Sequence, residues 1–132
     1  MGLIIDTSVI IRAERKRDAR FFAQFDVHGD AAISVITVSE LLVGVHLAEA
    51  EARANRRLAF VEAILSSIPA IDFTAETARI HSRIYARLRR QGETIGAHDL
   101  IIAATALGHG WGVLTANPRD FERVEGLQVV AP

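Results

Sequence analysis

Residues 2–9 of the chain read GLIIDTSV, and this stretch decides the fold. Its first five residues form an apolar run rich in isoleucine, which is typical of a short buried strand. A helical pattern follows directly over residues 8–26. The two sides of this predicted helix are marked by three phenylalanines (Phe21, Phe22 and Phe25) and by a basic stripe at four-residue spacing (Arg12, Lys16 and Arg20). A strand that leads at once into a helix predicts an α/β fold.

The same alternation of strand and helix continues along the chain. Residues 31–36 are predicted as a second strand, and a helix from Thr37 with a bend near Gly44 follows it. A longer helix then runs to about Ser66, with one apolar stripe formed by Leu47, Ala50, Ala54, Leu58, Val61 and Leu65. The remaining predicted elements are a strand over 68–73, a helix from its cap Thr74 to Gly92, a buried helix over 97–107, a strand at 113–114, a turn at Asn117-Pro118 and a strand over 127–130.

This order of elements predicts one domain over residues 1–132. Strands that alternate with helices favour a central parallel sheet, here of four to five strands, joined by right-handed crossovers. Helices then cover both faces of the sheet, which makes a three-layer α/β/α architecture.

Composition narrows the classes of function. Half of the residues are apolar and 23% are charged, as in a globular protein, and the net charge is −1. The chain has no cysteine, which excludes disulfides and zinc–thiolate sites, and Lys16 is its only lysine. The longest apolar run, residues 100–107, is far shorter than the roughly 20 residues of a membrane helix. No signal peptide is expected, and we expect a cytoplasmic location.

Four acidic residues lie at the ends of predicted strands and helices. Asp6 closes the first strand, Glu40 opens the second helix, Asp99 heads the apolar stretch HDLIIAATAL, and Asp120 follows a short strand in GVLTANPRDF. Sites in parallel α/β sheets form at the carboxyl ends of the strands, so the fold can gather these carboxylates into one pocket. Such a pocket binds hard divalent cations, which take oxygen ligands. That pattern favours metal-dependent hydrolysis of a phosphodiester.

Each carboxylate also has a purely local interpretation. Asp6 can equally well bind a metal or cap the helix that follows it. Asp120 can cap a turn. Glu40 fits a capping box with Thr37, which is the better interpretation of that residue alone. For Asp99 the role of cation ligand is the better explanation. It lies at the start of a helix that is otherwise buried, where an ionised carboxylate needs a partner. Like charges about 4 Å apart repel by roughly 4 kcal/mol at an effective dielectric near 20, so four clustered carboxylates need protonation or a metal.

The chain resembles the PIN-domain ribonucleases, and within them the VapC toxins of bacterial toxin–antitoxin pairs. The resemblance covers essentially the whole chain and rests on four segments in the family's order: LIIDTSVII, ISVITVSELLVGV, IGAHDLIIAATAL and GVLTANPRDFERVEGLQV. It implies a PIN-like fold and an Mg²⁺- or Mn²⁺-dependent endoribonuclease that uses water as the nucleophile. The implied catalytic residues are Asp6, Glu40, Asp99 and Asp120, of which the first three are the implied metal ligands.

The resemblance also suggests supporting residues and partners. Thr7 and Ser8 are expected to bond the phosphate or Asp6, or to cap the first helix. Thr115 and Asn117 are expected to serve the site or to shape the turn. The expected substrate is a structured RNA such as tRNA or rRNA, held by Arg12, Arg15 and Lys16 on one helix; a solvated face is the commoner meaning of such a stripe. A homodimer and a VapB-like antitoxin, in a heterotetramer or larger complex, are implied as well.

A second basic stripe, four arginines at helical spacing, is open to the same two interpretations: Arg79, Arg83, Arg87 and Arg90. His98 is expected to be a packing or hydrogen-bonding residue.

Three rival functions differ in the residues that they require. A haloacid-dehalogenase-like phosphatase would need a second acidic residue two positions after Asp6, where Ser8 stands. A receiver domain would need a lysine late in the chain, and none follows Lys16. A non-catalytic binding module that holds a basic partner peptide in the acidic pocket stays as the alternative, although the intact set of carboxylates speaks against it.

Overall fold

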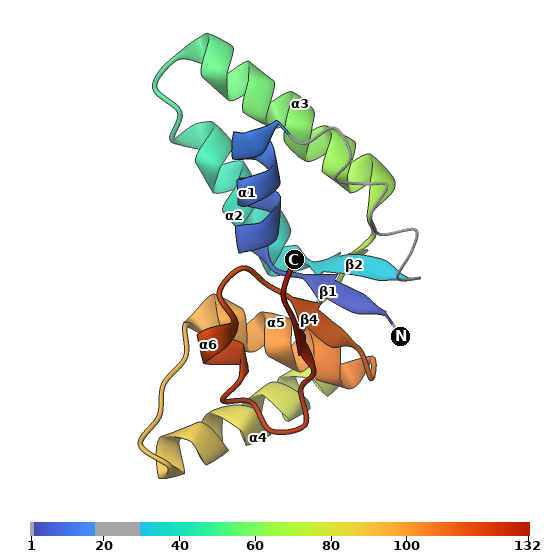
Figure 1. Ribbon diagram of the computed structural model, residues 1–132, viewed down its shortest axis with the longest axis vertical. Helices are drawn as coiled ribbons and strands as arrows, with labels where there is room; N and C mark the ends of the chain where they lie inside the picture. Colours follow the sequence, from blue (N-terminus) through green and yellow to red (C-terminus); the bar gives the residue numbers. More distant parts are fainter. Residues whose placement is uncertain (1, 18–29) are drawn as a thin grey trace.

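The computed structural model describes residues 2–17 and 30–132 (Figure 1). The described strands are β1 (Leu3–Ile5), β2 (Ala31–Ser34), β3 (Ala70–Ile71), β4 (Gly112–Leu114) and β5 (Val129–Val130). The described helices are α1 (Thr7–Lys16), α2 (Val35–His46), α3 (Glu51–Ser67), α4 (Ala75–Arg90), α5 (Ala97–Gly108) and α6 (Pro118–Phe121).

The five described strands form one parallel sheet in the order β3-β2-β1-β4-β5. β1 lies in the middle, with Leu3 in register with Ala31 of β2 on one side and with Gly112 of β4 on the other. The chain therefore moves outward in one direction through β2 and β3, and then returns to the other side of β1. The predicted α/β/α fold with a central parallel sheet is confirmed.

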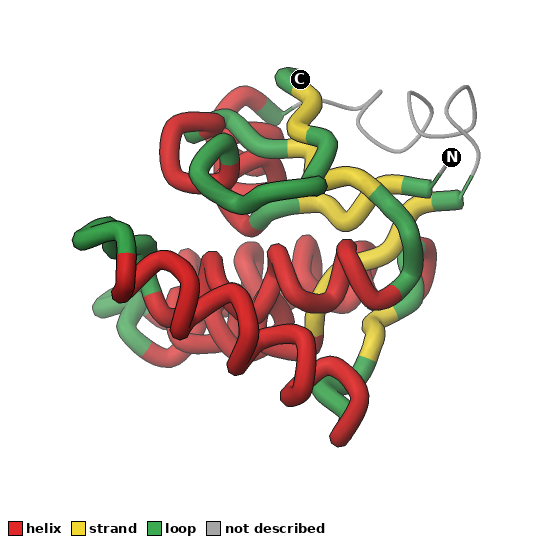
Figure 2. The backbone as a smooth tube through the Cα atoms, turned by 90° about the horizontal axis from the view of Figure 1, so that it is seen from below, coloured by secondary structure: helices red, strands yellow, loops and turns green. Residues whose placement is uncertain are grey.

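Helices cover both faces of the sheet, as Figures 1 and 2 show. Leu3 and Ile5 of β1 pack into the core on the side of α1, α2 and α3, whereas Ile4 between them packs into the core beneath α5. Alternate side chains of a strand point to opposite faces, so a run of three apolar residues serves two cores. Burying each such side chain stabilises the fold by about 1.5–3 kcal/mol.

The first helix is shorter than predicted. α1 ends at Lys16, because Arg17 adopts a left-handed conformation with φ 49° and closes the last turn. The rest of the predicted helix, including Arg20 and the three phenylalanines at 21, 22 and 25, lies outside the described residues.

The second helix begins two residues earlier than predicted. Ser34 is its N-cap, and the Ser34 hydroxyl accepts a hydrogen bond of 3.2 Å from the backbone N–H of Ile36. Thr37 is therefore inside α2 and not at its cap. The bend predicted near Gly44 is a complete break after His46, and α3 starts anew at Glu51.

The predicted apolar stripe was partly wrong, because it ran through this break. Leu47 lies in the break and is 75% exposed, and Leu58 also faces solvent. The buried positions of α3 are Val61 and Ile64, with Ala54 and Leu65 packed beside them. The apolar spacing of one helix does not continue into the next, because α3 runs in a different direction from α2 (Figure 1).

The later elements follow the prediction closely. Thr74 caps α4, accepting a hydrogen bond of 3.2 Å from the N–H of Thr77, and Gly92 follows the helix with φ 70°. The turn predicted at Asn117-Pro118 starts the one-turn helix α6. In the described ranges, none of the helices combines the length and hydropathy that crossing a membrane requires.

One glycine of the sheet is required by close packing. A Cβ atom on Gly112 of β4 would lie 2.9 Å from the backbone carbonyl oxygen of Gln128. Only glycine therefore lets the segment before β5 approach β4 closely enough to pair.

Candidate active site

The site begins at the point where the strand order reverses, between β1 and β4. Asp6 follows β1 and Thr115 follows β4, and the N–H of Asp6 donates to the carbonyl oxygen of Leu114 over 2.8 Å. The carboxyl ends of the two strands therefore lie side by side. In open parallel sheets this is the position at which ligands bind.

Asp6 is buried, with 4% of its surface exposed, and two hydroxyls hold its side chain. Its Oδ2 accepts hydrogen bonds from Ser8 (2.6 Å) and from Thr115 (2.8 Å). Asp6 also occupies the N-cap position of α1, but its side chain makes no capping hydrogen bond there. The local interpretation of Asp6 as a helix cap is therefore wrong, and its carboxylate is oriented by residues that are 2 and 109 positions away.

The same two hydroxyls tie the loop after β4 to the start of α1. Ser8 Oγ accepts a hydrogen bond of 3.2 Å from the N–H of Ala116, and Thr115 Oγ1 accepts one of 2.9 Å from the N–H of Asn117. Ser8 and Thr115 thus join both strand ends through Asp6. Asn117 shapes the start of α6 with its backbone, and its side chain makes no capping bond.

Glu40 is directed toward this point from α2. Its Oε1 accepts a hydrogen bond of 2.9 Å from the hydroxyl of Thr7, and its Oε2 lies 3.7 Å from Nδ1 of His98. The Thr7 hydroxyl is also 3.0 Å from the buried hydroxyl of Thr37. Because α2 begins at Val35, Glu40 is too far into the helix to close a capping box, and that local interpretation is wrong as well.

Asp99 is the third residue of α5 and is half-buried. The pKa of Asp99 is raised from 3.8 to about 6, mainly by burial and then by the charges of Asp6, Asp120 and Glu40 in that order, while His98 lowers it. These charges come from four different elements, so the fold brings all four predicted carboxylates within electrostatic reach of one another.

Asp120 differs from the other three because a cation already accompanies it. Nη1 of Arg123 lies 3.3 Å from Oδ1 of Asp120, and the same nitrogen donates to the carbonyl oxygen of Thr94 over 2.6 Å. Arg123 therefore links Asp120 of α6 to the loop before α5, and Asp120 adds negative charge near Asp99.

The oxygen-rich donor set fits a hard divalent cation. The pKa of Asp99 is raised by burial and by three nearby carboxylates, and a bound dication would offset the charge of those carboxylates. Within residues 2–17 and 30–132, no three acidic or histidine side chains stand close enough to hold one ion among them. Mg²⁺ commonly binds through one or two carboxylates and keeps several waters, so a site centred on Asp6 and Asp99 suits it.

Sequence reasoning left one residue without a role in this site and missed another. His98 is predicted to be a packing or hydrogen-bonding residue, and its Nδ1 lies 3.7 Å from Oε2 of Glu40. Arg123 had not been considered, although its three-residue distance from Asp120 is the spacing at which helical side chains meet. That spacing was the signal available for Arg123.

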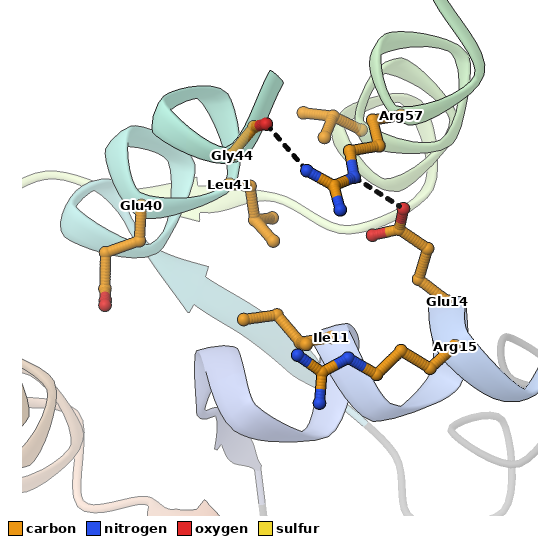
Figure 3. A pocket seen from close by; sticks show the side chains of 8 residues that line it. Ile11, Glu14, Arg15, Glu40, Leu41, Gly44 and Arg57 are labelled. Atoms are coloured by element: carbon orange, nitrogen blue, oxygen red, sulfur yellow. Dashed lines mark hydrogen bonds and ion pairs between the residues drawn. The ribbon is translucent and has the colours of Figure 1, made fainter. Parts of the chain in front are cut away.

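A cleft of about 190 Å³ opens beside Glu40, between α1, α2 and α3 (Figure 3). Its apolar lining comes from Ile11, Leu41 and Val61, with Arg15 at its edge. Arg57 of α3 spans the cleft, because it donates to the carbonyl oxygen of Gly44 over 2.9 Å and lies 3.8 Å from Glu14 of α1.

Of the residues predicted to contact RNA, Arg15 lines this cleft. Arg12, Arg15 and Lys16 are all exposed, and α1 starts directly after Asp6. The second basic stripe, on α4, is also exposed, and Arg87 in it pairs with Glu125.

Comparisons with known proteins place this geometry in a family. The model of the PIN domain family matches residues 3–127. The chain is 43% identical over 130 residues to Ribonuclease VapC1 of Rickettsia felis, covering 98% of this chain and 96% of the relative. It is 35% identical over 129 residues to the tRNA(fMet)-specific endonuclease VapC of Shigella flexneri, covering 97% and 96%.

Solved structures agree with the sequence relatives. The DNA-bound VapBC complex of Salmonella typhimurium contains a chain that superposes with a TM-score of 0.89 at 30% identity, covering 99% of this chain and 98% of that one. FitAcB from Neisseria gonorrhoeae matches with a TM-score of 0.82 at 31% identity, covering 98% and 96%.

Proposed function

The chain belongs to the PIN domain family, and from this premise we propose that it is the ribonuclease toxin of a toxin–antitoxin pair. In this proposal it hydrolyses RNA phosphodiester bonds at the acidic site around Asp6, Glu40 and Asp99, in the cytoplasm. The observation that carries the proposal is geometric: Glu40 contacts Thr7, the neighbour of Asp6, and also His98, the neighbour of Asp99. The pKa of Asp99, raised by burial and by three further carboxylates, supports it, because perturbed pKa values cluster at functional sites.

The position of each acidic side chain indicates its role in catalysis. Asp6 and Asp99 would hold Mg²⁺ or Mn²⁺, directly or through water, because Asp6 is fixed by two hydroxyls and Asp99 shares its electrostatic field. A bound cation would supply Lewis acidity, both toward the scissile phosphate and toward the attacking water. Glu40, held by Thr7, would orient that water and accept its proton, and Asp120 would complete the negative shell.

RNA specificity then has to come from binding, since attack by water does not need a 2′-hydroxyl. One relative is named as a tRNA(fMet)-specific endonuclease. We propose a structured RNA of the tRNA class for this chain too. Arg12, Arg15 and Lys16 would contact its backbone, because their helix begins at the catalytic aspartate.

The partner in this proposal is a VapB-like antitoxin, as in the solved VapBC complexes. The cleft of Figure 3 offers an apolar floor beside Glu40, so an apolar segment of the antitoxin would fill it and place a basic tail over the acidic site. A basic tail would offset the same negative charge as the metal. A homodimer of the toxin, within a heterotetramer or larger complex, completes the proposal.

An RNA-cleavage assay tests the proposal. The purified protein should cut RNA with Mg²⁺ or Mn²⁺ and stop in EDTA. Asp6→Ala and Asp99→Asn should each lower the rate by roughly 10²–10⁴-fold while the far-ultraviolet circular dichroism stays native. Glu62→Gln, an exposed carboxylate of α3, is the matched control and should cut like the wild type.

Two results would count against this function. Cleavage that continues in EDTA would exclude a metal-dependent mechanism. A protein that binds a VapB-like peptide but cuts no RNA with either metal would favour the non-catalytic binding module instead.

A further inference from the structure

A second cavity lies away from the cleft, between the C-terminal half of α4, the loop of residues 91–96 and the first turn of α5. Its volume is about 380 Å³, within the range of small-ligand sites. Leu88, Ile95 and Leu100 form apolar walls, and Tyr85 and Arg89 stand together on the α4 side. Glu93 and Thr94 add polar groups.

We infer that this cavity receives one unpaired nucleobase of the RNA substrate, stacked on Tyr85. The inference rests on the proposed ribonuclease function and adds a binding site to it. Proteins that read single-stranded RNA splay its bases onto aromatic rings and guanidinium planes, and this cavity presents one of each.

The geometry of Tyr85 and Arg89 suits a stacked base. The guanidinium carbon of Arg89 lies 5.8 Å from the centre of the Tyr85 ring, and Nη1 of Arg89 is 3.3 Å from the tyrosine hydroxyl. A base between the two groups needs roughly 6.8 Å, which is two stacking steps of about 3.4 Å each. The exposed Arg89 side chain would turn outward by the missing ångström and exchange its bond to the tyrosine hydroxyl for the base. On the helix turn before Tyr85, His81 lies nearly parallel to its ring, at 11°, and supports it.

The cavity lies next to the acidic site, and the side chain of Arg123 contacts both. Nη1 of Arg123 donates to the carbonyl oxygen of Thr94 at the cavity and also contacts Oδ1 of Asp120. Leu100, which lines the cavity, directly follows Asp99 in α5. A base in the cavity would therefore belong to a nucleotide close to the scissile phosphate.

Charge favours RNA over a second copy of the chain at this surface. α4 carries five arginines against one glutamate, Glu76: Arg79, Arg83, Arg87, Arg89 and Arg90. Two copies packed here by symmetry would bring like charges together, whereas a polyanion would be attracted. Of the five, Arg87 is already paired with Glu125.

Binding can be measured without cleavage by using the Asp99→Asn variant as the background. The probe is a short fluorescein-labelled single-stranded oligoadenylate, and the readout is its anisotropy. Adding Tyr85→Ala should raise the Kd about tenfold, as expected for one lost base–aromatic stack, and Tyr85→Phe should leave it within about twofold.

The control is Leu47→Ala. Leu47 is 75% exposed, lies between α2 and α3, and does not line the cavity. Leu47→Ala should leave the Kd unchanged. An abasic version of the probe should bind with the same Kd whether residue 85 is tyrosine or alanine, because it has no base to stack.

Three outcomes would overturn the inference: an unchanged Kd for Tyr85→Ala, an equal loss with the abasic probe, or a change of molar mass in sedimentation caused by Tyr85→Ala, which would mark an interface between copies. Wild-type cleavage that depends on Asp99 would leave the ribonuclease function standing in each case. Failure of every variant to bind RNA would instead count against that function.

Discussion

Replacing Asp99 by asparagine is expected to stabilise the metal-free protein at pH 7 while it abolishes cleavage. In the fold, burial and three neighbouring carboxylates raise the pKa of Asp99 from 3.8 to about 6. At pH 7 the folded protein therefore carries a charge that its surroundings disfavour. Asparagine keeps the shape of the side chain and removes that charge.

The magnitude follows from the size of the pKa shift. The shift is about 2 units, and one unit corresponds to about 1.36 kcal/mol, which sets an upper limit near 3 kcal/mol. Asp99 is only half-buried, so solvent screening lowers this value. Asparagine also loses the attraction of a carboxylate to the N-terminus of α5, about 0.3–1 kcal/mol. The expected gain in the free energy of unfolding is about 1–2 kcal/mol.

The assay is thermal unfolding in EDTA across a pH series. A raised pKa means that, between about pH 4 and pH 6, the folded protein holds a proton that the unfolded chain has lost. The stability of the wild type therefore falls as pH rises through this window, and that of Asp99→Asn does not. The difference in Tm should open between pH 4 and pH 6 and reach roughly 3–8 °C at pH 7.

Magnesium should reverse the order of stability. Binding to the folded wild type raises its Tm with concentration, whereas Asp99→Asn should respond weakly. Glu62→Gln on α3 is the control, for which no pH-dependent difference is expected in EDTA. If Asp99→Asn unfolds at a lower temperature than the wild type at pH 7 in EDTA, or if the difference does not vary with pH, the charge argument fails.

Three further predictions concern the parts of the fold that support the site. Gly112→Ala should lower the free energy of unfolding by about 1–3 kcal/mol, since its Cβ would lie 2.9 Å from a backbone oxygen. Gly44→Ala, with no atom within 4 Å of the new Cβ, should raise it by about 0.5–1 kcal/mol. Urea unfolding of the two variants measures both changes. Thr115→Val removes the hydroxyl that holds Asp6 and should lower kcat by at least about tenfold, with activity returning in Thr115→Ser; equal kcat in both variants would contradict the positioning role. Thr74→Ala should cost about 1 kcal/mol through loss of the α4 cap and leave kcat unchanged, as measured by denaturation and cleavage in parallel.

The reliable predictions from sequence were those set by neighbouring residues. The apolar run of β1, the Thr74 cap of α4 and the buried face of α5 all depend on residues within a few positions of one another. The errors arose where local patterns compete. Thr37 to Glu40 matches a capping box in sequence, but Ser34 caps the helix three residues earlier because β2 ends there.

The sequence by itself determined the types of element, their order and the acidic residues at their ends, because periodicity and capping are local properties of the chain. Only the tertiary structure decided which carboxylates lie close enough to repel one another and which is paired with an arginine. Asp6 meets Thr115 because β1 pairs with β4, and Asp99 gains its raised pKa because α5 packs beneath that pair. Both facts depend on contacts across about a hundred residues, which no local pattern contains.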